Sequence, residues 1–137
     1  MVLDTNVVAY CFFPGRFSED AIKLVGLVSD APVPPLWQSE FRNVLTLYLR
    51  KELLSIEEAV EIYSLAEERL TVIQPDKPTP RVLKLVNNSS CSAYDCEFID
   101  LARQLNTPLV TQDKKMLREF PDTAITIADA LTNTSEV

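Results

Sequence analysis

The chain alternates short apolar runs with stretches in which apolar residues recur at helical spacing. Residues 1–3 are apolar and stop at Asp4, which predicts a short strand. The apolar run 7–13 ends at the turn signal Pro14-Gly15 and predicts a buried helix. Three later runs are short, apolar and rich in β-branched residues, and they predict strands at 71–74, 109–111 and 123–127.

Apolar side chains spaced three and four residues apart predict helices between these strands. The expected helices cover residues 18–29, 39–51, 55–70, 79–88, 92–105 and 114–120. Ser18 and Ser92 are the expected N-caps of the first and fifth of these, and Ser55 with Glu58 three residues later forms a capping box. A cluster of prolines precedes the second helix, so residues 33–36 are expected to be extended.

Short, apolar strands that alternate with helices are typical of an open parallel sheet covered by helices on both sides. The 137 residues suffice for a single domain, expected over 1–131, followed by a polar tail at 132–137. No apolar run approaches the ~20 residues that span a bilayer. The first basic residue is Arg16, so we expect neither a secretory signal nor a membrane segment.

The composition excludes several kinds of catalytic site. The sequence has no histidine, which removes Ser-His-Asp triads, Cys-His proteases and His-ligated zinc or haem. The two glycines, Gly15 and Gly26, cannot build a Walker loop or a GxGxxG fingerprint. The three cysteines, Cys11, Cys91 and Cys96, match no zinc motif and are expected to be reduced core thiols of a cytoplasmic protein.

Four acidic residues from distant segments are expected to meet at one edge of the sheet. Asp4 and Asp113 follow two strands, whereas Glu40 and Asp95 fall in the first turns of two expected helices. The carboxyl ends of parallel strands face the same side as the helix starts, so the four carboxylates can converge there. Each residue also has a simpler interpretation, as a helix cap or as a first-turn acid that suits the helix dipole.

The position of Asp4 favours a shared site. Asp4 interrupts an apolar stretch that otherwise continues into the core, and a partly buried carboxylate is costly unless it is paired or bound to metal. An all-carboxylate site suits Mg²⁺ or Mn²⁺. The 20 acidic and 13 basic residues give a net charge of −7, so a polyanionic partner is expected only where bound cations reverse the local sign.

Four segments, in order, resemble those of a known family. They are Val-Leu-Asp-Thr-Asn at 2–6, Ser-Glu-Phe-Arg-Asn-Val-Leu at 39–45, Ser-Ala-Tyr-Asp-Cys-Glu-Phe-Ile-Asp-Leu-Ala at 92–102 and Leu-Val-Thr-Gln-Asp-Lys-Lys-Met-Leu at 109–117. Their order and spacing are similar to those of PIN domains, in particular the small PIN ribonucleases of VapC-type toxin–antitoxin pairs. The resemblance implies a three-layer α/β/α sandwich with a short, mainly parallel central sheet, and a Mg²⁺- or Mn²⁺-dependent endoribonuclease.

The resemblance also implies roles for particular residues. The acidic tetrad is Asp4, Glu40, Asp95 and Asp113. All of these except Glu40 are expected to hold the metal, and Thr5 and Thr111 fall where the family often places a hydroxyl beside it. Two further acids, Glu97 and Asp100, lie close to Asp95 in the sequence, and their roles stay open. On a helix, Glu97 points well away from Asp95, which argues against its taking part.

Basic and aromatic residues near the acids are candidates for contacts with RNA. Arg42 shares a helix with Glu40, and Lys114 directly follows Asp113, so both are candidate phosphate contacts. Trp37 and Tyr94 flank two of the acids and are candidates for base stacking, although core packing is favoured for Trp37.

Broad apolar faces on the helices expected at 39–51 and 55–70 indicate a partner, because one core does not cover so much apolar surface. The resemblance implies a small antitoxin protein and a homodimer. Tyr48 and Leu49 extend the apolar face and are the expected dimer contacts. Deeper burial of these residues within one chain is the alternative.

Other functions fit the motifs less well. A haloacid-dehalogenase-like phosphohydrolase needs Asp-x-Asp-x-Thr, but Asn6 stands where the second aspartate is required. A receiver domain needs a pair of acids after its first strand, where Asp4 stands alone. A non-catalytic PIN-like module that binds protein or RNA is the third alternative, and the four acids at the tetrad positions argue against it.

Overall fold

Parallel strands form the centre of the computed structural model, which describes residues 1–135. One sheet has the order β1-β4-β5, built from β1 (Val2–Leu3), β4 (Leu109–Val110) and β5 (Ala124–Ile125). The other pairs β2 (Ala31–Val33) with β3 (Leu70–Val72). Because β1 also contacts β2, the five strands lie in the spatial order β3-β2-β1-β4-β5. From β1 the chain first adds strands on the β2 side and later on the β4 side, so the strand order reverses between β1 and β4. That point is where open α/β sheets place their sites.

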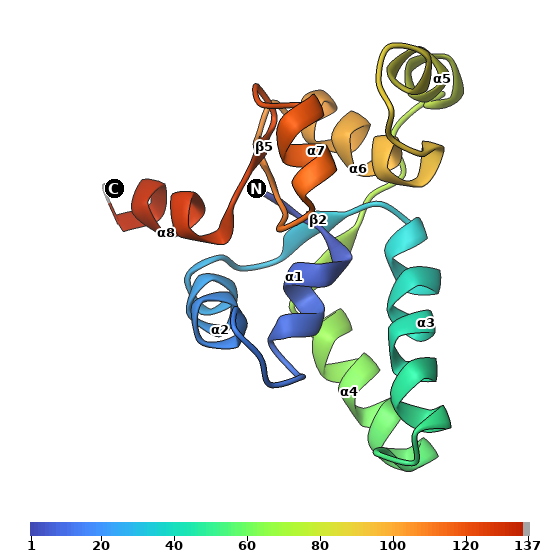
Figure 1. Cartoon of the computed structure of the whole chain (residues 1–137), viewed down its shortest axis with the longest axis vertical. Coiled ribbons are helices and arrows are strands. Elements are labelled where there is room, and N and C mark those ends of the chain that lie inside the picture. Colours follow the sequence, from blue (N-terminus) through green and yellow to red (C-terminus); the bar gives the residue numbers. More distant parts are fainter. Residues whose placement is uncertain (136–137) are drawn as a thin grey trace.

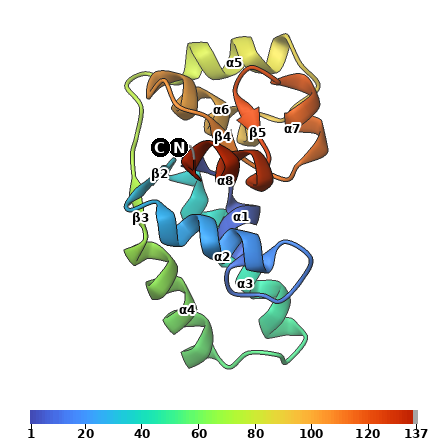
Figure 2. The same cartoon turned by 90° about the vertical axis from the view of Figure 1, so that its left-hand side faces the viewer.

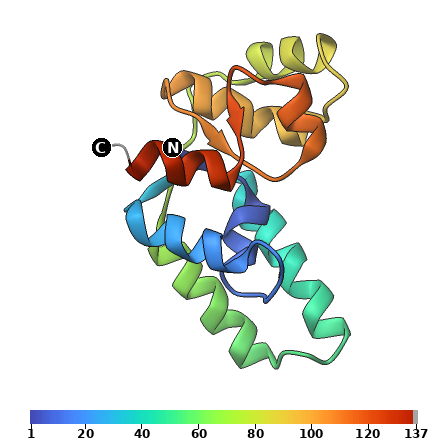
Figure 3. The same cartoon turned by 60° about the vertical axis from the view of Figure 1, so that its left-hand side comes forward.

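Helices connect and cover these strands (Figures 1 and 2). They are α1 (Thr5–Tyr10), α2 (Ser18–Leu27), α3 (Leu36–Arg50), α4 (Ile56–Glu68), α5 (Thr79–Asn87), α6 (Ala93–Gln104), α7 (Lys114–Glu119) and α8 (Ile127–Ser135). The arrangement is the three-layer α/β/α fold that the sequence predicts. Helices α3 and α4 run side by side as an arm that extends away from the sheet (Figure 3). Within residues 1–135, no helix is long and apolar enough to cross a membrane.

The core explains why the strands carry so few polar residues. Val2, Leu3, Leu109 and Val110 are completely buried, because helices cover both faces of the short sheet. Trp37 of α3 is also completely buried and stacks on Phe41 of the same helix, with the ring centroids 5.3 Å apart. This confirms that Trp37 belongs to the core. The three cysteines are free thiols, as expected, and two of them are buried.

Helix α3 begins earlier than the prolines suggested. Its first residue is Leu36, and the backbone N–H of Trp37 already donates to the carbonyl of Pro34 at 3.0 Å. Proline lacks only an N–H that a helix start does not use, so it did not delay the helix. The prediction of an extended segment at 33–36 is therefore wrong beyond Val33. Glu40 accordingly lies in the second turn of α3 and not in the first.

Two helix starts follow their predicted caps and one does not. The Ser55–Glu58 capping box is present in full, and the Ser92 hydroxyl accepts a hydrogen bond from the third backbone N–H of α6. Ser18 is not an N-cap, because it is already the first residue of α2 and its hydroxyl donates to the carbonyl of Phe13 at 2.9 Å. The hydroxyl thus stabilises the preceding loop instead of the helix end.

The end of the chain differs from the polar tail expected at 132–137. The last strand is shorter than predicted, and α8 follows it through Ser135. Ile127 and Ala130 of α8 are buried, the helix packs on α2, and the Thr126 hydroxyl accepts from the N–H of Asp129 at its start. Residues 136 and 137 of the expected tail lie outside the described residues.

The expected dimer contact at Tyr48 is occupied within the chain. The Tyr48 ring stacks on Phe13, with the centroids 3.8 Å apart, so one face of the ring is covered within the chain. The exposed apolar side chains of the α3–α4 arm include Leu47, Leu53, Ile56, Val60 and Leu65.

Asp100 has a structural role that the sequence left open. Only 2% of this residue is exposed, and its carboxylate accepts two hydrogen bonds from the guanidinium of Arg81, at 2.7 and 3.1 Å. Arg81 lies on α5 and Asp100 on α6, so the ion pair fastens α5 to the layer that covers the sheet. Asp100 therefore belongs to the scaffold.

Replacing Arg81 with methionine is expected to lower the melting temperature by several degrees, because the buried carboxylate of Asp100 would lose its partner. Thermal unfolding followed by circular dichroism measures this. Asp122→Asn is the matched control: the Arg103–Asp122 pair is exposed, so its melting temperature should stay near that of the unchanged protein. Equal melting temperatures for all three proteins would show that the Arg81–Asp100 pair does not stabilise the fold.

Candidate active site

A cavity of about 640 Å³ opens where β1 and β4 end. Its lining comes from four segments: Asp4, Thr5 and Asn6; Leu36, Ser39, Glu40, Asn43 and Val44; Tyr94 and Asp95; and Asp113. The structure thus brings together all four acids of the predicted tetrad. They come from the ends of two neighbouring parallel strands and from helices α3 and α6.

Asp4 and Asp113 serve as helix caps and line the cavity at the same time. Asp4 continues the β1–β4 ladder, since its N–H donates to the carbonyl of Val110 at 3.0 Å. The Oδ1 atom of Asp4 accepts a hydrogen bond from the N–H of Thr5 at 2.8 Å and caps α1. The Oδ1 atom of Asp113 accepts from the N–H of Met116 at 3.0 Å and caps α7. The cap interpretation and the site interpretation are therefore compatible, because each carboxylate oxygen has two lone pairs and a helix cap uses only one of them.

Thr111 links the two strand ends. Its side chain is completely buried, and its hydroxyl donates to Oδ2 of Asp4 at 2.6 Å. The hydroxyl oxygen of Thr111 also accepts from the N–H of Asp113 at 3.0 Å and, more weakly, from the side-chain amide of Asn6 at 3.5 Å. A single hydroxyl thus fixes the orientation of one carboxylate and the backbone position of the other.

Thr5 ties Glu40 to the same centre. The Thr5 hydroxyl donates to Oε1 of Glu40 at 2.7 Å, although the two residues are 35 positions apart in the sequence. Thr5 is itself buried, and its backbone N–H binds Asp4. The two threonines that the sequence singled out therefore each hold one acid of the tetrad.

Burial makes Asp4 a weak acid. Loss of solvent raises its pKa from the usual 3.8 to about 7, and the negative charges of Glu40 and Asp95 act in the same direction. The hydrogen bonds from Thr111 and Thr5 oppose this shift but do not cancel it. Asp4 is therefore the carboxylate whose charge depends most on what else occupies the cavity.

The pKa values of Glu40 and Asp95 are also raised. Burial is the largest cause of both shifts. The charges of Asp95 and Glu97 raise the pKa of Glu40 further, and the charge of Asp113 raises the pKa of Asp95 further. Ser92 and the nearby Lys115 partly offset the shift of Asp95. These mutual effects show that the acids behave as one electrostatic group.

The donor chemistry of the cavity fits a hard divalent cation. All its acidic ligands offer oxygen, and Oδ1 of Asn6 is buried beside them without a hydrogen-bond partner. Within residues 1–135, however, no three Asp, Glu, Cys or His side chains are grouped closely enough to form a ready metal cage. This arrangement fits an ion held by one or two carboxylates together with water, as is usual for Mg²⁺.

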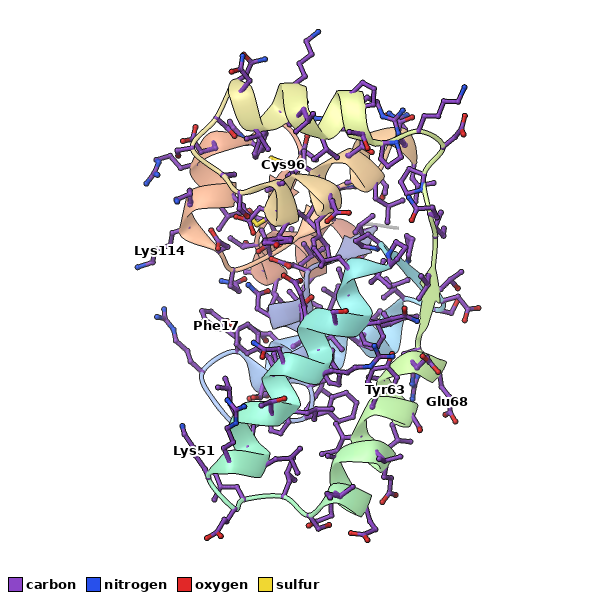
Figure 4. All side chains as sticks on the ribbon, turned by 90° about the vertical axis from the view of Figure 1, so that its right-hand side faces the viewer. Phe17, Lys51, Tyr63, Glu68, Cys96 and Lys114 are labelled. Carbon is purple, nitrogen blue, oxygen red and sulfur yellow. The ribbon has the colours of Figure 1, made fainter. Side chains whose placement is uncertain are left out.

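Neither of the two basic residues proposed to contact RNA lines the cavity. The Arg42 guanidinium lies 5.3 Å from the centre of the Tyr63 ring and borders a groove between α3 and α4 instead. Tyr63 faces α3 from α4 in Figure 4. Lys114 is exposed at the start of α7, and its side chain extends outward in the same view. The placement argues against Arg42, and Lys114 stays a prediction.

Glu97 lies outside the cavity, beside Pro34, Pro35 and Asp100, in agreement with its expected direction on α6. Its charge nevertheless reaches Glu40 and raises the pKa of that residue.

Lys115, which follows Lys114, donates to the carbonyl of Ser90 at 3.3 Å and so connects α7 to the loop before α6.

The sequence interpretation missed polar residues of the lining. Asn6 follows Asp4 by two positions, and Ser39 and Asn43 share one face of α3 with Glu40. The spacing of three residues between Glu40 and Asn43 is the signal that was available, because residues three apart lie on the same face of a helix.

The fold and the cavity agree with one family. The family model described as "PIN domain" matches residues 1–122, and the chain belongs to this family. PIN domains are generally metal-dependent nucleases. PAE2754 from Pyrobaculum aerophilum has a similar solved structure, with a TM-score of 0.78 and 17% sequence identity, covering 99% of this chain and 89% of that chain. At that identity the likeness shows the fold alone. No curated protein matches the sequence.

The raised pKa of Asp4 predicts how stability depends on pH without metal. The unfolded chain ionises this carboxyl near 3.8 and the folded chain only near 7, so the folded state binds more protons between these values. The free energy of unfolding should therefore fall as pH rises from about 4 to about 7, by up to about 4 kcal/mol, and then level off. Urea unfolding in EDTA at several pH values measures it.

Asp4→Asn should be more stable than the unchanged chain at pH 8 in EDTA and should show a flatter pH dependence. The difference between the two proteins should shrink as pH falls from about 7 towards 4, because Asp4 is protonated in the folded chain there and becomes increasingly protonated in the unfolded chain. A variant with the same pH slope as the unchanged chain would show that Asp4 does not carry this dependence.

Proposed function

We propose that the chain is a Mg²⁺- or Mn²⁺-dependent endoribonuclease and the toxin of a toxin–antitoxin pair. The observation that carries the proposal is the cavity in which Asp4, Glu40, Asp95 and Asp113 meet at the carboxyl ends of β1 and β4. Membership of the PIN family supports nuclease activity. The resemblance to VapC-type ribonucleases supports RNA as the substrate.

In this proposal Asp4, Asp95 and Asp113 hold the cation, directly or through water, and Glu40 completes its surroundings. When bound, the ion supplies a water of lowered pKa and offsets charge on the phosphate. Thr111 keeps Asp4 and the backbone of Asp113 in register, and Thr5 keeps Glu40 turned toward Asp4. Lys114 contacts an RNA phosphate beyond the cavity.

The cation has a second consequence in this proposal, because the chain carries a net charge of −7. An acidic surface repels RNA, and bound divalent ions reverse the sign of the field at the cavity. Substrate therefore binds where the carboxylates hold metal, and the protein acts in the cytoplasm, where RNA is available.

Asp4→Asn and Asp113→Asn are each expected to lower the rate of RNA cleavage by at least about 100-fold, because each removes a carboxylate that holds the ion. Cleavage of a long unstructured RNA is measured with Mg²⁺, with Mn²⁺ and with EDTA. Asp122→Asn removes an exposed carboxylate that does not line the cavity, so this control should cleave RNA normally. Cleavage that persists in EDTA or in Asp4→Asn would contradict the proposal.

The proposal includes two protein partners, a small antitoxin and a second copy of the chain. An apolar groove of about 450 Å³ between α1, α2 and α4, bordered by exposed Ile22 and Leu65, supports the antitoxin. The exposed Ile56 and Val60 of the α3–α4 arm support the homodimer.

Val60→Glu is expected to convert a dimer of twice 15.4 kDa into a monomer, because it replaces an exposed apolar side chain next to Ile56 with a charge. Sedimentation at micromolar concentration measures this. Leu83→Glu, on an exposed part of α5, is the control and should leave the dimer intact. A chain that is monomeric before any substitution would contradict the homodimer.

A further inference from the structure

The cavity is partly apolar, which a metal site alone does not explain. Leu36, Glu40 and Val44 lie four residues apart on α3 and all line it, so the face of α3 that carries the acid is apolar on both sides of it. Leu36 and Val44 are half-buried. The ring of Tyr94 on α6 also belongs to this lining.

Tyr94 differs from the other tyrosines of the chain. Tyr10, Tyr48 and Tyr63 each pack against another ring. Tyr94 is 63% exposed and has no ring contact among residues 1–135, although it directly precedes Asp95. A mainly exposed aromatic ring that stacks on no other ring of its own chain is available to stack on a ligand.

The cavity also has room for more than an ion. A divalent cation with six waters needs roughly 200 Å³, at about 30 Å³ for each water. The cavity measures about 640 Å³, so a large part of it is left for the substrate. The remaining polar groups of the lining, Ser39 and Asn43, are neutral hydrogen-bonding groups of the kind that contact base edges.

We propose that Tyr94, Leu36 and Val44 form a subsite for one nucleobase next to the scissile phosphate. The base stacks on the Tyr94 ring, the two aliphatic side chains exclude water from the subsite, and Asn43 hydrogen-bonds the edge of the base. This inference rests on the proposed nuclease function and deepens it. It makes the substrate an RNA whose base is already unstacked, in a loop or a single strand, because bases in a duplex cannot reach the ring.

The test uses the full-length chain and a short RNA that it cleaves at one bond. The base on either side of that bond is replaced in turn by an abasic nucleotide, and kcat/KM is measured for the unchanged chain and for three variants. Tyr94→Ala removes the ring, Tyr94→Phe keeps it, and Leu83→Ala on α5 is a matched control for loss of an exposed apolar side chain.

One of the two abasic substitutions should lower kcat/KM of the unchanged chain about tenfold, and Tyr94→Ala should lower it about as much on intact RNA. When Tyr94→Ala is tested on the abasic RNA, kcat/KM should be little lower than with either change alone, because both changes remove the same contact. Tyr94→Phe keeps the ring and should recover most of the rate that Tyr94→Ala loses, whereas Leu83→Ala should behave like the unchanged chain. Asn43→Ala should change the preference among the four bases at that position.

Equal rates for Tyr94→Ala and the unchanged chain, or additive losses in the combination, would overturn the subsite while leaving the nuclease in place. A chain that cleaves no RNA with Mg²⁺ or Mn²⁺ would overturn the proposed function and the subsite together. Cleavage of a perfect duplex as fast as of its single strand would also contradict the subsite.

Discussion

The hydrogen bond between Thr111 and Asp4 is the interaction on which the site depends. It holds a buried carboxylate at the end of β1, and the same hydroxyl fixes the backbone of Asp113 at the end of β4. Because the two strands are neighbours in the sheet, small changes at Thr111 move both acids at once. The core beneath them consists of completely buried aliphatic residues, so the acids can turn only toward the cavity.

This arrangement places like charges close together at a cost to the empty site. The pKa of Asp4 rises to about 7 because it is buried and faces Glu40 and Asp95. In the proposed function, a cation bound here would offset the repulsion and displace the proton of Asp4, so affinity for metal would be linked to pH. The ionised carboxylate of Asp4 therefore destabilises the fold above its pKa when no cation is bound, and such a cost is common where residues are arranged for function and not for folding.

Much of this was predictable from the sequence, and the exceptions have physical reasons. Asp4 interrupts an apolar run, and that interruption marks a strand end at the edge of the sheet that carries the candidate site. The direction of Arg42 was not predictable, because it depends on Tyr63 of a different helix. Tyr48 likewise found a partner, Phe13, through a long-range contact that periodicity does not reveal. Helix α3 started early because its prolines suit a first turn as well as a loop.

The most direct test of the account is the number of protons released when the cavity takes up a cation. Titration calorimetry with Mn²⁺ at about pH 6.5, in two buffers of different ionisation enthalpy, gives that number. Asp4 is largely protonated there, since its pKa is about 7, so the unchanged chain should release a large fraction of one proton for each ion bound. Asp4→Asn should release much less. Binding without proton release, or equal release by both proteins, would contradict the claim that the buried carboxylate of Asp4 is the centre of a cation site.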